Sequence, residues 1–377
     1  MDFSLTDEQQ ALYASMLKLG RDVIAPGAAQ RDKDGTWDPA VWKAVSAAGV
    51  AGMPIPEEYG GSGGSILDCC LVNEALAEGG RDGGFGLSLG AHWVIGSVPI
   101  WLHGTEEQKK RWLPGLTSGE LIGCWASTEP EAGSDAGGIL ATARRDGDDW
   151  VINGTKIFIT NGPIADVCTV LARAPEGPTA FIVDTRNEGF QVGRELDKMG
   201  CRSSPTAEIH FNECRVGPDA VLGEVGKALW QVAFECFDWE RTVMLAATVG
   251  GMRATIDHTI TYAKERQQFG KPIAHFQAVA HKLAQMEVNY QVVKNAVYKA
   301  AWLKQHDKPH IIEASAAKIL CGDLAVQNAL ESIQIHGGYG YLRDFPAERA
   351  LRDSKLASIG GGTTEIQKMI ISRTMLA

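Results

Sequence analysis

The apolar residues of this 377-residue chain change their spacing twice, and the two changes separate a helical part, a strand-rich part and a second helical part. In the first part they recur every three or four residues, as at Leu12, Met16 and Leu19. Similar runs cover residues 41–50 and 67–76, with Gly- and Pro-rich breaks between them. The pattern predicts a helical N-terminal domain.

Short β-rich runs follow at residues 150–152, 156–160, 180–183 and 207–211. Two segments between or beside them, Asp146-Gly147-Asp148 and Asn153-Gly154, have the composition of tight turns. No helix-length segment lies between the runs, so a small β-sandwich or β-barrel is favoured over a βαβ arrangement.

Helical spacing returns after about Gly226. Met252, Ile256, Ile260 and Ala263 form one stripe, and a longer stripe indicates the core of a helical bundle. Its residues are Leu283, Met286, Tyr290, Val293, Val297 and Ala300. We therefore predict an α+β protein, mostly α, with a helical domain over residues 1–120, a β domain over 121–226 and a helical bundle over 227–377.

Composition narrows the functional classes. A net charge of -10 and a pI near 5.4 argue against a nucleic-acid partner, which would need a clustered basic face. No apolar run approaches the roughly 20 residues of a membrane span. The opening Met1-Asp2-Phe3-Ser4 carries an acid where a secretory leader carries bases. We expect a cytoplasmic protein without a membrane or nucleic-acid partner.

Several common catalytic classes find no support in the sequence. The eight cysteines are scattered, without a C-x-x-C pair or a histidine at zinc spacing, so reduced thiols and no metal site are expected. No G-x-G-x-x-G, P-loop, H-E-x-x-H or G-x-S-x-G motif occurs, which argues against Rossmann dinucleotide binding, zinc proteolysis and serine hydrolysis.

Five segments rich in polar residues and glycine interrupt the regular pattern, and each alone is typical of a turn or loop. They cover residues 125–135, 158–161, 266–270, 334–340 and 359–367. In this order, and on this helix, sheet and helix arrangement, they resemble the acyl-CoA dehydrogenase family over essentially the whole chain. The resemblance implies that family's fold, with a C-terminal four-helix bundle after the middle β-barrel or β-sandwich.

The resemblance also implies FAD as the cofactor. Hydroxyl donors to the flavin ring and pyrophosphate are matched by Thr128 and Ser134, and Phe158 stands where many members place a tryptophan beside the isoalloxazine. A hydroxyl position beside the ring and the last FAD contacts are matched by Thr160, Thr363 and Glu365.

Two further segments match positions that reach the FAD of a neighbouring subunit, where arginine supplies charge and glycine allows close backbone approach. The matching residues are Arg266, Gln268, Phe269, Gln334, Gly337 and Gly338. The resemblance therefore implies a homo-oligomer, by similarity a homotetramer. His336, inside the second segment, is interpreted as a packed or FAD-adjacent residue and not as an acid or base.

The family's reaction is α,β-desaturation of an acyl thioester, in which a carboxylate removes the α-proton and the β-hydrogen leaves as hydride to flavin N5. Electrons then pass to an acceptor such as an electron-transfer flavoprotein. In most members the carboxylate stands two residues before the loop threonine, where this chain has Gly361. A subset that includes isovaleryl-CoA dehydrogenase carries it just before an arginine on the helix that opens the bundle, and Glu240-Arg241 match that pair.

Glu240 has an alternative interpretation as a solvent-facing residue in a first helical turn, where it would favour the helix dipole. Because Gly361 lacks the acid, we identify Glu240 as the general base, with a pKa raised by burial. Arg241 is expected to position the helix and set the pocket electrostatics, or else to pair with Asp238 at the surface.

Gly360 stands where a bulky tyrosine is frequent in the family, so the glycines at 360–362 are expected to leave volume near the acyl Cα and Cβ. Arg241, Gly360 and Gly361 are the predicted substrate contacts, and a short, branched or cyclic acyl group would fit. The resemblance also extends to enzymes that oxidise prolyl groups on a peptidyl carrier protein. Both carriers, CoA and an acyl or peptidyl carrier protein, therefore stay open here.

Two other functions also stay open. A flavin oxidase or monooxygenase on the same fold would not need a thioester base, and a degenerate member kept for assembly would lack bound flavin. Intact FAD segments together with Glu240 favour an FAD-dependent acyl-thioester dehydrogenase, an oxidoreductase acting on CH-CH groups.

Overall fold

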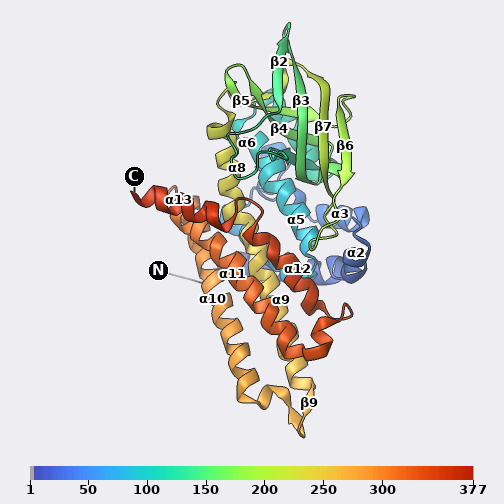
Figure 1. The fold of residues 1–377 in the computed structure, drawn as a ribbon, viewed down its shortest axis with the longest axis vertical. Helices are drawn as coiled ribbons and strands as arrows, with labels where there is room; N and C mark the ends of the chain where they lie inside the picture. The colour runs from blue at the N-terminus through green and yellow to red at the C-terminus, as the bar shows by residue number, and fades with distance from the viewer. Residues whose placement is uncertain (1–3, 377) are drawn as a thin grey trace.

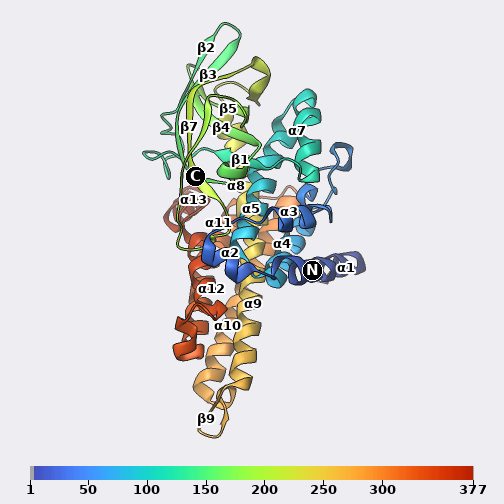
Figure 2. The ribbon, with the colours of Figure 1, turned by 90° about the vertical axis from the view of Figure 1, so that its right-hand side faces the viewer.

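The computed structural model describes residues 4–376, and it arranges the sheet, the N-terminal helices and the bundle as an elongated molecule (Figure 1). The sheet lies at one end, and the long bundle helices extend from the middle to a hairpin at the other end. The N-terminal helices lie beside the middle of the molecule (Figure 2). Residues 1–3, on which the expected absence of a leader partly rested, lie outside the described residues.

Helices build the N-terminal part, and side chains cap several of their first turns. Thr6, Ser65 and Thr105 each accept the N–H of the residue three positions later, at 3.2, 3.1 and 3.3 Å, and that residue's side chain returns a hydrogen bond. The helices are α1 (Asp7–Leu19), α2 (Ala28–Asp34), α3 (Pro39–Ser46), α4 (Ile66–Gly80), α5 (Gly83–Ala91), α6 (Val98–His103) and α7 (Glu106–Ser118).

The β domain is one mixed sheet of eight strands within the described residues. Its order is β6-β7-β3-β2-β4-β5-β8, and β1 pairs with β4 in parallel. Trp150 and Phe181 meet edge to face at 5.4 Å in its apolar core. The strands are β1 (Gly123–Ala126), β2 (Thr142–Asp146), β3 (Asp149–Thr160), β4 (Val167–Ala174), β5 (Gly177–Asp184), β6 (Phe190–Glu195), β7 (Thr206–Val216) and β8 (Val221–Leu222).

One predicted turn is confirmed and the other is wrong. The Asp146-Gly147-Asp148 segment joins β2 to β3, with Asp146 opposite Asp149. Asn153-Gly154, however, lies inside β3, where the pairing with β7 shifts register at a bulge. The Asn153 side chain bonds Glu213 on β7 twice, at 2.8 Å each, so cross-strand pairing wins over the local turn preference.

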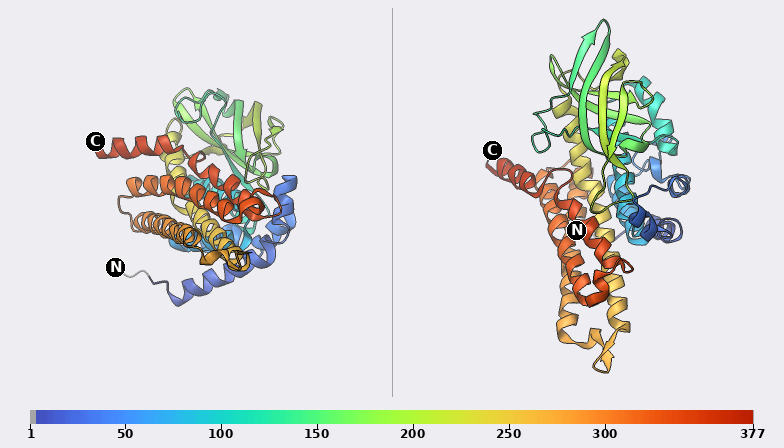
Figure 3. Two further views of the ribbon diagram at one scale, coloured as in Figure 1. Left: turned by 60° about the horizontal axis from the view of Figure 1, so that its bottom comes forward. Right: turned by 45° about the vertical axis from the view of Figure 1, so that its right-hand side comes forward.

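The C-terminal part is a bundle, and the predicted stripes form its core. Met252, Ile256 and Ala263 are buried on α9, and Met286, Val293, Val297 and Ala300 are buried on α10. Figure 3 shows the long helices side by side, with α13 projecting from them. The elements are α8 (Phe234–Trp239), α9 (Leu245–Glu265), β9 (Gln267–Gln268), β10 (Lys271–Pro272), α10 (Gln277–Gln305), α11 (Ile311–His336), α12 (Pro346–Ser354) and α13 (Thr364–Leu376).

Close contact between α4 and α9 fixes the wall of the site described below. A Cβ at Gly250 would lie 2.1 Å from the carbonyl oxygen of Glu74, so only glycine lets the two helices approach this closely. The buried Glu74 carboxylate also accepts hydrogen bonds from Lys294 at 2.7 Å and Tyr298 at 2.6 Å on α10. One buried carboxylate thereby joins the N-terminal helices to the bundle.

The helical run Gly83–His103 is long and apolar enough to cross a membrane by length and composition alone. The expectation that no such segment exists is therefore wrong by this measure. Within the protein, 72% of its apolar window is buried, as in the core helix of a soluble protein.

Candidate active site

Glu240 lies in the middle of a long helical run and not in a first turn. The run begins at Leu229 and continues through α8 and α9, and Glu240 opens a π-helical turn within it, Glu240–Met244. Single π-helical turns inside α-helices occur frequently at functional sites. The alternative of a solvent-facing glutamate at a helix N-terminus is therefore wrong.

The Glu240 carboxylate lies against the backbone of Gly361. A Cβ at position 361 would lie 2.6 Å from Oε1 of Glu240, closer than real Cβ atoms come, and 3.0 Å from Oε2. Gly361 also has a φ of +66°, which side chains rarely adopt. The carboxylate of position 240 thus fills the space of a side chain at position 361.

Two cations lie near this carboxylate. Burial raises the pKa of Glu240, and the charges of Lys318 and Arg241 oppose that rise. Lys318, on α11, is 5% exposed, and its Nζ donates to the carbonyl oxygen of Ala357 at 2.9 Å. Lys318 was not predicted from the sequence, because a lysine within an apolar helix gives no distinctive signal.

Arg241 does not pair with Asp238, so the surface ion pair considered for it is wrong. Asp238 instead contacts Lys304, and its Oδ2 accepts a hydrogen bond from His310 Nε2 at 2.8 Å. The Arg241 guanidinium lies 5.7 Å from the centre of the Phe237 ring. Its Nε is buried and has no hydrogen-bond partner among residues 4–376.

The predicted free volume at the glycine run exists only in part. The side-chain space of Gly361 is taken by Glu240, and that of Gly362 by Gln367, whose Nε2 would lie 2.7 Å from a Cβ. Gly360 does line a cavity, and a Cβ there would lie 3.4 Å from Leu356. The prediction is therefore wrong for Gly361 and Gly362.

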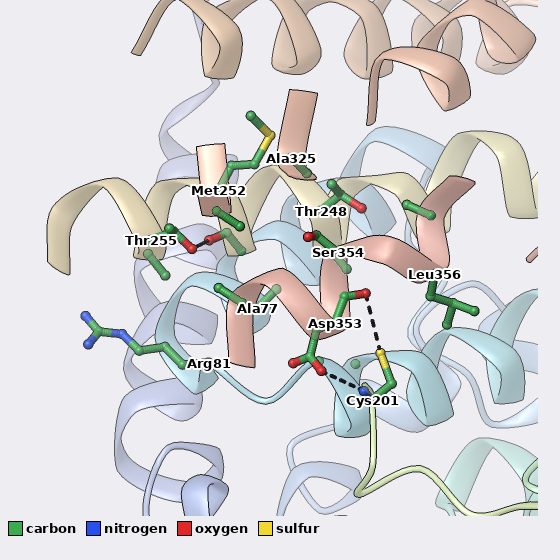
Figure 4. Close-up of a pocket in the computed structure, with 18 of the residues that line it drawn as sticks. Ala77, Arg81, Cys201, Thr248, Met252, Thr255, Ala325, Asp353, Ser354 and Leu356 are labelled. Carbon is green, nitrogen blue, oxygen red and sulfur yellow. Dashed lines mark hydrogen bonds between the residues drawn. The ribbon is translucent and has the colours of Figure 1, made fainter. Parts of the chain in front are cut away.

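A cavity of about 260 Å³ adjoins Glu240. Helices distant in sequence form its walls: the end of α4, the start of α5, α9, α11 and α12 (Figure 4). Apolar side chains such as Leu87, Met244 and Met252 line much of it. Its charged lining residues are Glu240, Lys318, Arg81, Asp82, Arg349 and Asp353. An apolar cavity with few polar groups is typical of a small-molecule site.

The first set of predicted FAD residues lies beside the sheet. Phe158 is 65% exposed with a φ of +60°, at an irregular point of β3, and Thr160 pairs with Thr206 on β7. The Thr128 carbonyl accepts the Ile157 N–H at 2.9 Å, which ties its loop to β3. Ser134 is exposed on the same loop.

A buried ion pair supports this loop and was not predicted from the sequence. Lys156 donates to Glu129 Oε1 at 2.7 Å and to the Ser127 carbonyl at 3.0 Å. The Glu129 carboxylate also accepts the N–H groups of Leu140 and Ala141 at 2.6 and 3.0 Å. Lysine inside an otherwise β-rich run was the signal that could have predicted this pair.

The second set lies at the opposite end of the molecule, near β9 (Figure 1). A cavity of about 370 Å³ there is lined by Arg266, Gln268, Gly337 and Gly338. Two other predicted residues lie outside its lining: Gln334 is exposed on α11, and Phe269 is 93% exposed.

His336, also in the wall of this second cavity, packs as predicted. Its ring stacks on Tyr262 with centroids 4.2 Å apart, and its Nδ1 lies 2.7 Å from the Ser332 carbonyl oxygen.

The last two predicted FAD residues surround the start of α13. Thr363 Oγ1 accepts the Ile366 N–H at 3.3 Å. Glu365 is exposed, and hydrogen bonds from its own N–H and from Thr363 hold its pKa below the ordinary value.

The structure thus brings Glu240, Arg241, Gly360 and Gly361 together and keeps the β9 end apart from the sheet.

Comparison with known families covers nearly the whole chain in three parts. Residues 6–120 match the N-terminal domain of acyl-CoA dehydrogenase, residues 124–214 its middle domain and residues 230–376 its C-terminal domain.

Curated relatives match over their full length or close to it. A probable acyl-CoA dehydrogenase, YngJ, of Bacillus subtilis (strain 168) is 41% identical, with all of both chains covered. The mitochondrial isovaleryl-CoA dehydrogenase of Pongo abelii is 38% identical, covering 99% of this chain and 90% of the relative.

Solved structures show the same architecture. Butyryl-CoA dehydrogenase from Megasphaera elsdenii superposes with a TM-score of 0.96 at 37% identity, covering all of both chains. The prolyl acyl carrier protein oxidase AnaB has a TM-score of 0.95 at 34% identity, covering 99% of this chain and all of that one. An FAD complex of PigA has a TM-score of 0.96 at 34% identity, covering 100% and 99%. With three matching domains and relatives of this similarity, the chain belongs to the acyl-CoA dehydrogenase family.

Proposed function

We propose that this protein is an FAD-dependent dehydrogenase of acyl thioesters, with Glu240 as the base. The observation that carries this proposal is the Glu240 carboxylate beside the backbone of Gly361, at the head of an apolar cavity. Burial keeps the pKa of Glu240 above its ordinary value, which suits proton abstraction from a carbon next to a thioester carbonyl.

The proposed reaction breaks two C–H bonds. Glu240 takes the α-proton, the electron pair of that bond forms the Cα=Cβ bond, and the β-hydrogen leaves with its electrons as hydride. FAD, when bound, would supply the hydride acceptor. Arg241 and Lys318 keep Glu240 ionised before proton transfer and face the neutral acid after it.

The residues present fit FAD. Phe158 offers an exposed aromatic face beside Thr160, and Thr128 and Ser134 offer hydroxyls on a loop held by the buried Lys156–Glu129 pair. At the other end, a Cβ at Gly337 or Gly338 would meet no atom within 4 Å, so the backbone is open to a ligand. The solved PigA complex contains FAD on the same fold.

The separation of the two FAD sets supports a homo-oligomer, by family resemblance a tetramer. One chain holds Phe158 beside the sheet and Arg266 near β9, at opposite ends of the molecule (Figure 1). A second copy could place its β9 end against the first copy's sheet. We also propose that the protein is cytoplasmic and that its domain borders lie near residues 120 and 226. The proposed electron acceptor is an electron-transfer flavoprotein.

Exposed aromatic rings on the helix before Glu240 indicate where the carrier arm lies. Trp230 is 75% exposed and stacks on Phe234 at 4.8 Å, and Phe234 meets Phe237 at 6.3 Å. These rings form a solvent-exposed apolar surface on the helical run that contains Glu240. Such a surface suits contact with a pantetheine arm. Isovaleryl-CoA dehydrogenase among the relatives supports a short or branched acyl-CoA.

A second candidate is dehydrogenation of a prolyl group held on a carrier protein. The similarity to the prolyl acyl carrier protein oxidase AnaB supports it. The catalytic base and the fold would be the same, and only the group at the entrance would differ.

The test is anaerobic bleaching of the bound oxidised flavin by isovaleryl-CoA and, separately, by prolyl carrier protein. We expect one of them to bleach the wild type and not Glu240→Gln, while both proteins retain flavin. Equal bleaching of the variant would contradict the assignment of Glu240. If neither these two compounds nor any other acyl thioester bleaches the wild-type flavin, the proposed reaction is contradicted.

A further inference from the structure

The cavity continues far beyond the carbons that would react at Glu240. It follows the helical run of α9, and its lining includes Met244, Thr248, Thr255 and His258. His258 lies 18 residues after Glu240, which is about 27 Å at 1.5 Å per residue. A volume of about 260 Å³ spread along such a length describes a narrow channel that suits an extended chain.

Glycines keep this channel open in its middle. Gly86 on α5 and Gly251 on α9 both line it, and a Cβ at either position would meet no atom within 4 Å. Side chains at these positions would project into space that is now free. The channel is therefore open between the reacting end and the far end.

Two polar groups without partners lie at the far end. The Arg81 side chain is exposed and makes no ion pair or hydrogen bond with residues 4–376. Its backbone is bonded: the N–H donates to the Ala77 carbonyl and the carbonyl accepts from Arg349, both at 3.1 Å. His258 Nε2 is buried and has no hydrogen-bond partner in the same part of the chain. Figure 4 shows Arg81 and Thr255 at one side of the channel.

The two groups are near each other and together favour an anion. Burial, the neighbouring His336 and the charge of Arg81 lower the pKa of His258 to about 4, so its ring is neutral at physiological pH. A neutral imidazole can donate from Nε2 while Arg81 supplies the positive charge. Buried polar atoms without partners are rare in proteins and call for an explanation.

Nearby acids are already engaged. Asp82 binds Arg31 at 2.9 Å, and Asp257 binds Arg253 at 2.6 Å. Asp353, which also lines the channel, accepts the Cys201 N–H at 2.6 Å. Arg81 and Arg349 both line the channel at this end, and neither has a carboxylate partner among residues 4–376; Arg349 instead donates to the Arg81 carbonyl at 3.1 Å.

We propose that Arg81 and His258 form a recognition site for a carboxylate at the far end of the acyl chain. The preferred substrate is then the monothioester of a long-chain dicarboxylic acid, extended along α9 with its thioester at Glu240. It replaces the short or branched acyl group that the isovaleryl-CoA dehydrogenase relative favours. This inference rests on the proposed dehydrogenation and adds the chemical class of the acyl group. Arg81 and His258 bind the tail and take no part in bond breaking.

The test compares kcat/KM for two graded series of acyl-CoA esters, one with a methyl terminus and one with a carboxylate terminus at equal chain length. At the matching length we expect wild type to favour the carboxylate by about tenfold to a hundredfold, the range of a charge-assisted hydrogen bond. Arg81→Gln and His258→Leu should lose most of that preference and keep their kcat/KM for the methyl series.

Arg21→Gln is the matched control, because Arg21 is exposed and lies outside the cavity lining. It should behave as wild type in both series. Equal losses in both series for Arg81→Gln would overturn the proposal, as would a wild-type preference for methyl termini at every length. Flavin bleaching by the methyl series would still support the dehydrogenase reaction in either case, so the two proposals fail separately.

Discussion

The carboxylate of Glu240 and the backbone of Gly361 occupy one place: a Cβ on Gly361 would lie 2.6 Å from Glu240 Oε1. The two residues are far apart in sequence and come from different elements, a π-helical turn and the loop before α13. A carboxylate can reach this point from the helical turn at position 240 or from the loop at position 361. The space holds only one of the two side chains.

The contact predicts that the cost of a side chain at position 361 depends on Glu240. Gly361→Ala should destabilise the protein, because alanine is strained at a φ of +66° and its Cβ meets the carboxylate. In a Glu240→Ala background only the strain remains, about 1 kcal/mol. A double-mutant cycle of urea unfolding measures the difference. Equal costs in both backgrounds would contradict the contact.

Lys318 is predicted to set the pH range in which the enzyme works. Its charge opposes the raised pKa of Glu240, and Glu240 must be ionised to accept a proton. Removing the charge in Lys318→Met raises the pKa of Glu240 further. The acid limb of the kcat/KM profile should therefore move to higher pH.

Lys355→Met is the control for this profile, because Lys355 is exposed and lies outside the cavity lining. Its acid limb should coincide with that of wild type. An unshifted acid limb in Lys318→Met, with flavin still bound, would show that Lys318 acts through its bond to Ala357 alone.

Predictions from sequence succeeded where the pattern is local and repeated. The stripe through Met252 and Ile256 gave α9, because burial of one helix face imposes its period on the sequence. Asn153-Gly154 was predicted as a turn because its preference is local. In the structure the Asn153-Gly154 segment is part of β3, because Asn153 bonds Glu213 across the sheet. No pattern in the neighbouring sequence indicates that contact.

The site was predictable only in part for the same reason. Family resemblance identified Glu240 and Gly361, but their contact depends on how α13 follows α12. The π-helical turn at Glu240 has no sequence period of its own. The channel to His258 has walls from α4, α5 and α12, so its length could not be seen before these helices were packed.

Subunit mixing should test whether two chains build one FAD site. Arg266→Ala and Phe158→Ala should each reduce retained flavin, although the two positions lie at opposite ends of one chain (Figure 1). A refolded mixture of the two variants should recover part of the flavin, because some sites then combine an intact sheet with an intact β9 end. Each variant refolded alone is the control, and a mixture no better than these would contradict a shared site.

Asp353 is predicted to make stability fall as the pH rises. Burial raises the pKa of its carboxyl from 3.8 to about 6, so the folded protein favours the protonated form. The stability that protonation contributes is full below the ordinary pKa of 3.8 and is lost as the pH rises through about 6. Asp353→Asn keeps an oxygen for the Cys201 N–H but cannot ionise.

The variant should therefore match wild type in acid and exceed its free energy of unfolding by about 3 kcal/mol above neutral pH. Denaturant unfolding across that range gives the difference. Asp353→Leu separates charge from hydrogen bonding, since it also removes the acceptor of the Cys201 N–H and should be less stable than Asp353→Asn at every pH. A difference between wild type and Asp353→Asn that stays constant with pH would mean that the pKa of Asp353 is the same in the folded and the unfolded protein, and would contradict the raised pKa.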